Sequence, residues 1–375
     1  MKQLYILIFF LSINCFSQNE FITVWKTNPS DSNIEPSIHF TTVVNDSTYS
    51  YVWQQVDENF TELTPDSTLV CNMTIPGTHD TFTYQLDYEF VTKYWWRTQT
   101  ADVARQFDIG IRCFDFRPHY VDKGKDSYLQ IYHNRRNCQI SFDEAFRSVV
   151  GFVTENPSEF AIVYLNYETG DNDSAQKKAG KEMLARMLLG YMDEYGPESI
   201  AFFRPDVTLG EIRHKVLIIC RDNYEGFDLP FAAFINNWDD FSGKGFLSTG
   251  GKKEEARACT LFSQDLYAVY DWDHFHEKSD AFDSCAKAFL ADGTACPWCI
   301  NNASGFMGHS EKTLNYNEFA YKSNPYVISY AEKMTGKDGR GLGIVMMDFA
   351  GETEFGLVKY KVFGDKLVDA LIAVN

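Results

Sequence analysis

The sequence predicts an α/β protein built on a distorted (βα)8 barrel, preceded by a short β-rich appendage. Eight short apolar, strand-like segments recur after residue 67, and helical or long connections separate them. Apolar strands buried on both faces are typical of a parallel sheet, and eight can close into a barrel. An open doubly wound sheet is the alternative, disfavoured because no glycine-rich phosphate motif follows the first strand. The expected strands are 69–75, 110–116, 128–132, 160–165, 216–220, 260–262, 298–301 and 342–347.

The connections between these strands contain helical patterns. Ser141 and Glu144 form a capping-box pattern at the start of one helix, and Asn156-Pro157 ends it. An apolar stripe on 176–195 predicts a long helix. Further helices are expected at 100–107, near 324–335 and at 363–373.

The ends of the chain and its charge define three regions and exclude some partners. Residues 1–18 combine Lys2 with a short apolar run, which predicts a cleaved signal peptide and a secreted protein. Lipidation at Cys15 is disfavoured because Asn14 precedes it. Residues 19–66 form the β-rich appendage, and residues 67–375 form the barrel. A net charge of −18 argues against nucleic acid and bulk anionic membrane, so any lipid contact must be local and aromatic.

The cysteines indicate structure rather than chemistry. Cys113 and Cys220 lie in apolar strands and are expected to be buried thiols. Cys285, Cys296 and Cys299 are close enough in sequence to include a disulfide in an oxidising compartment. Cys296-Pro-Trp-Cys299 also resembles a redox dithiol or half a zinc site, but no second half accompanies it, so zinc is disfavoured.

Polar residues follow every predicted strand. In a barrel of parallel strands these positions converge on one mouth, where active sites of this architecture lie. The sequence therefore predicts a site made of several strand ends. Its expected members are His79-Asp80, Arg117, His133, Asn166, Arg221, Asp265, Asn301-Asn302 and Asp348.

This set of side chains suits the cleavage of a phosphodiester by an internal hydroxyl group. Two histidines can act in turn as base and acid, an aspartate can orient one imidazole, and an arginine can bind phosphate through two donors. Asp115 and Arg117 alternate along one strand and share a face. The guanidinium of Arg117 could then take the place of a cation, so no metal cofactor is expected.

The motifs resemble those of the bacterial phosphatidylinositol-specific phospholipases C, the X-domain family. The resemblance covers about residues 67–375. It implies a distorted (βα)8 barrel that cleaves phosphatidylinositol, with glycosylphosphatidylinositol anchors as a related substrate class, to diacylglycerol and a cyclic inositol phosphate. The motifs are Ile75-Pro-Gly-Thr-His-Asp80, Gly110-Ile-Arg-Cys-Phe-Asp-Phe-Arg117, His133, Asn156-Pro-Ser-Glu159, Val216–Arg221, Ser263-Gln-Asp-Leu-Tyr267 and Asp348.

The resemblance also implies roles for the catalytic residues. His79 resembles the general base, with Asp348 as its orienting partner, and His133 resembles the general acid. Arg117 would hold the phosphate oxygens, while Asp80 would position Arg117 or assist the leaving group. Arg117 stands where calcium-dependent relatives keep an acidic ligand, so the chain resembles the metal-independent branch, and calcium is the less favoured alternative.

The resemblance extends to the substrate. Arg221 and Asp265 match positions that hydrogen-bond inositol hydroxyls, and Tyr267 matches an aromatic floor under the ring. Trp95 falls near a tryptophan that inserts into the membrane surface, and Trp95-Trp96 would supply the aromatic lipid contact. The expected partner is phosphatidylinositol or a related phospholipid at a membrane surface. No segment indicates an obligate protein partner.

Two departures from the family pattern bear on specificity. Asn166 stands where metal-independent members carry a lysine on the inositol side. Asn134-Arg-Arg-Asn137 replaces the usual His-Gly and adds positive charge, which predicts a preference for a more anionic headgroup. His119 is a rival acid but is expected at the surface, and Arg112 is expected to be a structural ion-pair partner. Two other functions remain: a metal-dependent glycerophosphodiesterase-like barrel and a non-catalytic binding module.

Overall fold

The computed structural model describes most of the chain. Its described residues are 23–26, 38–44, 47–53, 60–86, 96–224, 226–236, 238, 243–249, 257–308, 315–336, 339–357 and 359–375. The chain divides into two compact units, residues 1–54 and 55–375. The predicted signal peptide at 1–18, with Cys15, and the tryptophan at position 95 lie outside the described residues.

The first unit contains a three-stranded antiparallel sheet in the order β1-β2-β3. The strands are β1 (Thr23–Lys26), β2 (Ile38–Val44) and β3 (Ser47–Trp53). The predicted boundary at residue 66 is too late, because the short helix α1 (Phe60–Leu63) belongs to the second unit. There Thr61 donates a side-chain hydrogen bond to Glu159, and its carbonyl accepts one of 2.9 Å from Arg213.

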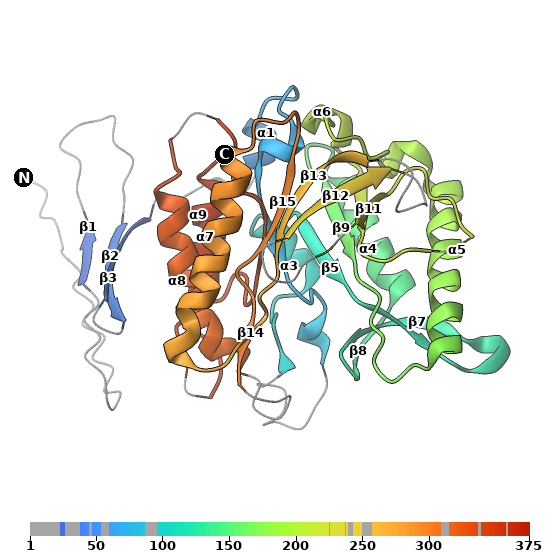
Figure 1. Cartoon of the computed structure of the whole chain (residues 1–375), viewed down its shortest axis with the longest axis horizontal. Helices are drawn as coiled ribbons and strands as arrows, with labels where there is room; N and C mark the ends of the chain where they lie inside the picture. Colours follow the sequence, from blue (N-terminus) through green and yellow to red (C-terminus); the bar gives the residue numbers. More distant parts are fainter. Residues whose placement is uncertain are drawn as a thin grey trace, which may run out of the picture. The chain divides into compact units, whose positions relative to one another are not determined.

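The second unit is the predicted barrel, closed by nine strands in the order β10-β11-β12-β13-β15-β17-β4-β5-β9 (Figure 1). Neighbours are parallel except β12, which runs antiparallel to β11 and β13. That reversed strand is the distortion of the barrel. The strands are β4 (Thr74–Thr78), β5 (Cys113–Phe116), β9 (Ala161–Leu165), β10 (Val216–Cys220), β11 (Ala233–Asn236), β12 (Gly243–Thr249), β13 (Arg257–Gln264), β15 (Trp298–Asn302) and β17 (Gly343–Met347).

One predicted barrel strand lies elsewhere. β7 (Tyr128–His133) belongs to a separate antiparallel sheet with β6 (Pro118–Val121) and β8 (Arg136–Ser141). Figure 1 shows the β6–β7 hairpin projecting beside one end of the long helix α5 (Ser174–Ser199). Its mixed pattern of apolar and polar residues suits a hairpin better than a strand buried on both faces. β11 and β12 complete the barrel instead, and the glycine-containing β12 has no apolar run that would have predicted it.

The first barrel strand is shifted from its prediction. Val70–Asn72 forms a 3-10 turn, and Pro76-Gly77 lies inside β4 rather than ending it. Gly77 fits a crowded position, since a Cβ there would lie 2.6 Å from Met346 Sδ and 3.1 Å from the Cβ of Cys113. His79 still follows the strand directly, as the sequence predicted.

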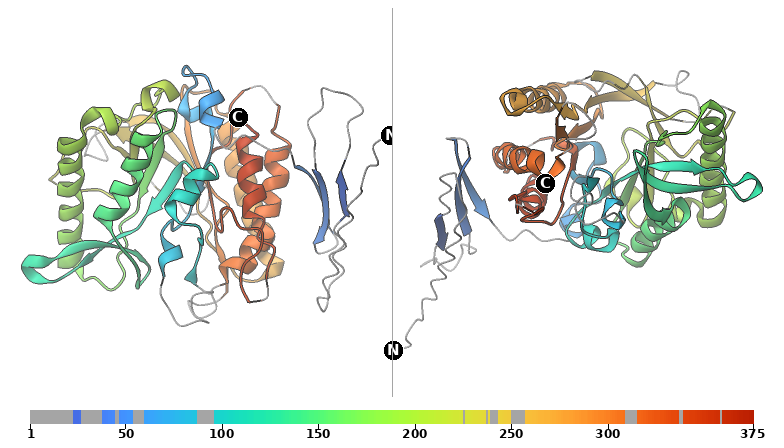
Figure 2. Two further views of the ribbon diagram at one scale, coloured as in Figure 1. Left: turned by 180° about the vertical axis from the view of Figure 1, so that it is seen from behind. Right: turned by 90° about the horizontal axis from the view of Figure 1, so that it is seen from below.

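Helices pack against the outside of the barrel. α7 packs on β13 and β15, α9 packs on β4, and α8 packs on α9 (Figure 2). The capping box of Ser141 and Glu144 is present at the start of α4. Helix α8 begins eight residues before the predicted start, and Pro325 lies inside it rather than at its first turn. Helix α7 was not predicted, because the buried Lys278 interrupts its apolar stripe. The helices are α3 (Val103–Asp108), α4 (Phe142–Glu155), α5, α6 (Leu209–Ile212), α7 (Phe275–Ala291), α8 (Tyr316–Glu332) and α9 (Gly364–Ile372).

Two further features complete the fold. Among the described residues, no helix is both long and apolar enough to cross a membrane. The described cysteines are free thiols, with Cys113 and Cys220 buried as expected. Cys299 on β15 faces Cys285 on α7, with 3.9 Å between the two Sγ atoms.

Candidate active site

His79 and Asp348 meet at the mouth because β4 and β17 are parallel neighbours. Met347 pairs with Thr78 at the strand ends, so the next residue of each strand lies beside the other. The Nδ1 atom of His79 is 2.9 Å from Oδ1 of Asp348. A carboxylate at this position keeps the hydrogen on Nδ1 and turns Nε2 towards the mouth. Asp348 itself is buried.

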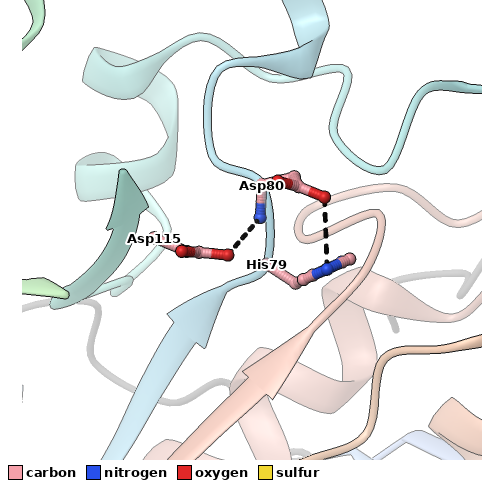
Figure 3. A group of neighbouring side chains, drawn as sticks. All are labelled: His79, Asp80 and Asp115. Atoms are coloured by element: carbon pink, nitrogen blue, oxygen red, sulfur yellow. Dashed lines mark hydrogen bonds and ion pairs between the residues drawn. The ribbon is translucent and has the colours of Figure 1, made fainter. Parts of the chain in front are cut away.

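Asp80 is the common neighbour of the positively charged groups. Its Oδ2 atom lies 3.2 Å from His79 Nε2 and 3.3 Å from His133 Nε2, and its Oδ1 atom lies 3.4 Å from Arg117 Nε. Both carboxylate oxygens are buried, and neither accepts a well-aligned hydrogen bond from the described residues. Figure 3 shows Asp80 just past the end of β4, between His79 and Asp115. A single carboxylate oxygen therefore faces both imidazoles.

Arg117 is held at the mouth by Asp115, which precedes it by two residues on β5. The Nε atom of Arg117 lies 2.9 Å from Asp115 Oδ2, and one terminal nitrogen lies 2.8 Å from the same oxygen. Asp115 Oδ2 also accepts a 3.0 Å hydrogen bond from the backbone N–H of Asp80. This arrangement fixes the guanidinium next to Asp80, where a phosphate oxygen could reach it.

His133 reaches the site from the β7 hairpin rather than from the barrel. Its Nδ1 atom donates to the backbone carbonyl of Trp96 at 2.9 Å, and its Nε2 atom is 3.1 Å from the Tyr316 hydroxyl. The ring centroids of His79 and His133 are 6.5 Å apart. The structure thus brings together all five predicted catalytic residues, although one comes from a different sheet.

Neighbouring charges and burial shift the pKa values of the two histidines in opposite directions. Burial lowers the pKa of His79, but Asp80 and Asp348 outweigh it and raise that pKa to about 9. Burial also lowers the pKa of His133, and Asp80 only partly offsets this effect. Burial disfavours the Asp80 carboxylate, yet Arg117, then His133 and His79, bring its pKa to about 2. In the ligand-free site the proton therefore resides on His79, and His133 is neutral.

The predicted substrate residues lie on the neighbouring strand ends. Arg221, after β10, contacts Asp265, after β13, with 3.4 Å between Nη1 and Oδ2. The guanidinium of Arg221 also lies over the Trp238 ring, 4.2 Å from its centroid. Tyr267 is half exposed at the rim. Asn166 follows β9, which lies between β5, the strand before Arg117, and β10, the strand before Arg221. Its backbone N–H donates to the Phe116 carbonyl.

The proposed membrane role of Trp96 is wrong. Its side chain is buried, with its ring 5.8 Å from that of His133. The Arg136 guanidinium lies over the Trp96 ring, 3.3 Å from its centroid. Trp96 is thus part of the support for His133, while Arg135 is exposed.

Sequence reasoning missed two tyrosines. Tyr316 starts α8 and contacts His133, but no motif marks it. Tyr164 lies inside β9, and its buried hydroxyl has no hydrogen-bond partner among the described residues. Arg221, Asp115 and Asp265 are its charged neighbours. A polar residue in the otherwise apolar run of β9, at the position of a barrel-lining side chain, was the signal available for Tyr164.

His119 and Arg112 are both buried, which contradicts the prediction for His119 and confirms the one for Arg112. His119 is buried, not at the surface: Nδ1 lies 2.9 Å from the Glu168 carbonyl, and its ring is 4.3 Å from that of Tyr132. It contacts these groups rather than Asp80. Arg112 is indeed a buried ion-pair partner, with 2.6 Å to Glu159.

The donor set at the mouth does not fit a calcium ion. His79, Asp80 and Asp115 offer ligand atoms within 4.8 Å of one another (Figure 3). Calcium takes about six to eight oxygen ligands, whereas this group includes an imidazole. Both carboxylates already face the Arg117 guanidinium. The described residues therefore favour an arginine, rather than a hard cation, as the positive charge here.

Fold and site together define this second unit as an α/β barrel with an acid–base site at the carboxyl ends of its strands. Comparison with known proteins shows what this region resembles: residues 73–222 match the family model of the phosphatidylinositol-specific phospholipase C X domain. The resemblance inferred from the motifs is thereby confirmed.

Individual relatives support the same result. The chain is 27% identical over 297 residues to the 1-phosphatidylinositol phosphodiesterase of Listeria monocytogenes, covering 76% of this chain and 78% of that protein. A solved phosphatidylinositol-specific phospholipase C from Staphylococcus aureus matches with a TM-score of 0.66 and 19% identity, over 84% of this chain and 97% of the other. The solved Listeria monocytogenes enzyme matches with a TM-score of 0.61 and 23% identity, over 85% and 99%. These structural likenesses establish the fold.

Proposed function

We propose that this chain is a phosphatidylinositol-specific phospholipase C, which cleaves phosphatidylinositol to diacylglycerol and a cyclic inositol phosphate. The observation that carries the proposal is one carboxylate oxygen, Asp80 Oδ2, within 3.3 Å of both histidine Nε2 atoms, with Arg117 beside it. Two imidazoles and one guanidinium are the groups that an internal phosphodiester displacement needs.

The roles are those that the family resemblance implies, and the contacts support them. His79, oriented by Asp348, takes the proton of the inositol 2-hydroxyl, whose oxygen attacks phosphorus. Arg117 binds the phosphate oxygens as charge builds up on them. His133 gives its Nε2 proton to the diacylglycerol oxygen as the bond from phosphorus to that oxygen breaks. Arg221, Asp265 and the residues around them bind inositol hydroxyls.

The reaction requires a proton on His133, whereas the ligand-free site holds it on His79. Both Nε2 atoms face the same Asp80 oxygen, so the pair can carry one proton in either arrangement. A bound phosphate monoanion adds negative charge near both imidazoles and favours their protonated forms. Substrate binding therefore supports a proton on His133, and the two imidazoles titrate as a coupled pair.

We further propose that no metal takes part, that the protein is secreted after cleavage of residues 1–18, and that it acts on a lipid surface without a protein partner. The metal proposal is supported by the Arg117 guanidinium, which lies 2.8 Å from Asp115. The secretion proposal is supported by the apolar N-terminal run. Trp95 remains the proposed lipid contact, while Trp96 is not one.

Phosphorus NMR of the protein with phosphatidylinositol vesicles, with and without EDTA, tests the reaction and the cofactor together. We expect a cyclic inositol phosphate signal in both samples. Signal lost in EDTA and restored by calcium would support the metal-dependent alternative. No product in either sample would contradict the proposed substrate, and vesicles of a phosphorylated phosphatidylinositol would then test the headgroup preference predicted from Arg135 and Arg136.

A further inference from the structure

Tyr316 is the first residue of α8 and closes the site over His133. Its hydroxyl is 3.1 Å from His133 Nε2, and its ring centroid is 5.5 Å from that of His133 and 6.5 Å from that of His79. The side chain is buried, and burial raises the pKa of Tyr316 well above its usual value. The hydroxyl therefore keeps its hydrogen at neutral pH.

The hydrogen-bond partners of His133 decide its tautomer. Nδ1 faces the carbonyl oxygen of Trp96 at 2.9 Å, and a carbonyl can only accept, so Nδ1 carries a hydrogen in every protonation state. Neutral His133 then has a bare lone pair on Nε2. The bare Nε2 atom lies 3.3 Å from an oxygen of the Asp80 carboxylate, which is an unfavourable contact unless a donor occupies the lone pair.

We propose that Tyr316 is the positioning residue that supplies this donor: its O–H binds the bare Nε2 of neutral His133 and stabilises the state that follows proton donation. The inference rests on the proposed function only in treating neutral His133 as the form left after proton donation to the leaving group. An acid whose conjugate base is stabilised gives up its proton more readily. Tyr316 thus makes His133 a stronger acid in a site whose carboxylate would make it a weaker one.

The direction of the change in the His133 pKa follows from the groups that contact its protonated and neutral forms. Charged groups around His133 are Asp80 and His79 from the end of β4, and Arg117 from the end of β5. The Arg136 guanidinium lies behind the Trp96 ring. Protonated His133 is stabilised by the charge of Asp80, 3.3 Å from its Nε2 atom, and does not need the tyrosine as a donor. Neutral His133 has only the Tyr316 hydroxyl as a donor among the described residues, so loss of that hydroxyl penalises the neutral form.

The test is an NMR titration of imidazole-labelled protein without substrate. Loss of one hydrogen bond to the neutral form should raise the pKa of His133 by about 0.5–1 pH unit in Tyr316→Phe. The matched control is Tyr330→Phe, a partly buried tyrosine further along α8 whose ring packs on Phe282. It should leave the His133 titration unchanged. Tyr316→Met removes the same hydroxyl if the phenylalanine variant does not fold.

Kinetics give a second readout. In Tyr316→Phe we expect kcat to fall several-fold while KM changes little, and the alkaline limb of the pH–rate profile to move up with the His133 pKa. An unmoved titration in a folded variant would overturn the proposal, whatever happens to the rate. Because the titration uses no substrate, its failure is separate from failure of the proposed function, which would appear as absence of product in the unmodified protein.

Discussion

Arg112 and Arg117 flank the same strand, β5, and each is paired with a buried carboxylate, yet the two clusters are built differently. Arg112 precedes the strand and pairs with Glu159 at 2.6 Å. Arg117 follows it and pairs with Asp115 and Asp80. The first lies at the amino ends of the parallel strands and the second at their carboxyl ends, where active sites of barrels lie.

The Arg112 cluster is closed. Its Nε donates to Glu159, and one terminal nitrogen donates to the carbonyls of Phe107 and Ile111, each at 2.8 Å. Thr61 donates to the same carboxylate. No side-chain atom of Arg112 or Glu159 is a buried atom without a partner in the described part of the chain. A cavity of about 240 Å³ adjoins this pair, on the amino-terminal side of the barrel.

The mouth cluster is left incomplete. Both Asp80 oxygens lack a well-aligned hydrogen bond among the described residues, and so does the Tyr164 hydroxyl. Unsatisfied buried groups cost stability, whereas satisfied ones hold a structure together. The comparison teaches that the closed cluster serves the fold, and the open one is available for a substrate and a moving proton.

The largest expected effect is on catalysis. Replacing His79 or His133 by Ala should lower the rate per folded molecule by about 10²–10⁴. An inositol phosphodiester with a good leaving group separates the roles: it should restore much of the rate of His133→Ala but not of His79→Ala. Rescue of His79→Ala alone would reverse the assignment of base and acid.

The next effect is on stability. Glu159→Gln leaves the buried Arg112 without its charge partner and should cost about 3–5 kcal/mol of unfolding free energy, measured by urea denaturation. Activity per folded molecule should stay unchanged. The control is Lys287→Gln, which removes an exposed pair with Asp283 and should cost about 0–1 kcal/mol. Equal costs for both variants would contradict the structural role of the Arg112 cluster.

The pH dependence of stability is the third effect. His79 has a folded-state pKa of about 9, above its unfolded value of about 6.5. Its contribution is therefore fully present below pH 6.5 and is lost as the pH rises through 9. That contribution is on the order of 3 kcal/mol. Denaturation at pH 6 and pH 9.5 should show the loss in the unmodified protein, and much less in His79→Gln; equal losses would contradict the shift.

The smallest effect concerns the unsatisfied hydroxyl. Tyr164→Phe should raise stability by about 1 kcal/mol, since it removes a buried polar group without a partner. It should also raise KM for phosphatidylinositol several-fold if the hydroxyl binds the inositol ring. A matched control is Tyr191→Phe, whose hydroxyl donates to Asp143 at 2.8 Å and whose loss should destabilise. A stability loss in Tyr164→Phe would show that the hydroxyl is satisfied.

Much of the site could be predicted from the sequence, because strand ends are local features. Buried apolar runs such as 160–165 and 216–220 define the strands, and a parallel barrel brings the residues after them together. His79, Arg117, Arg221, Asp265 and Asp348 were found in this way. The barrel itself also followed from the number and apolar character of these runs.

The tertiary structure alone decided the rest, because it depends on contacts distant in sequence. β7 joins a hairpin rather than the barrel, yet it delivers His133 to the same place, 3.3 Å from Asp80. Trp96 turns inward because Arg136 and His133 pack on its ring, which no pattern around residue 96 indicates. Tyr316 lies 183 residues from His133 in the chain, and only the fold places its hydroxyl on that imidazole.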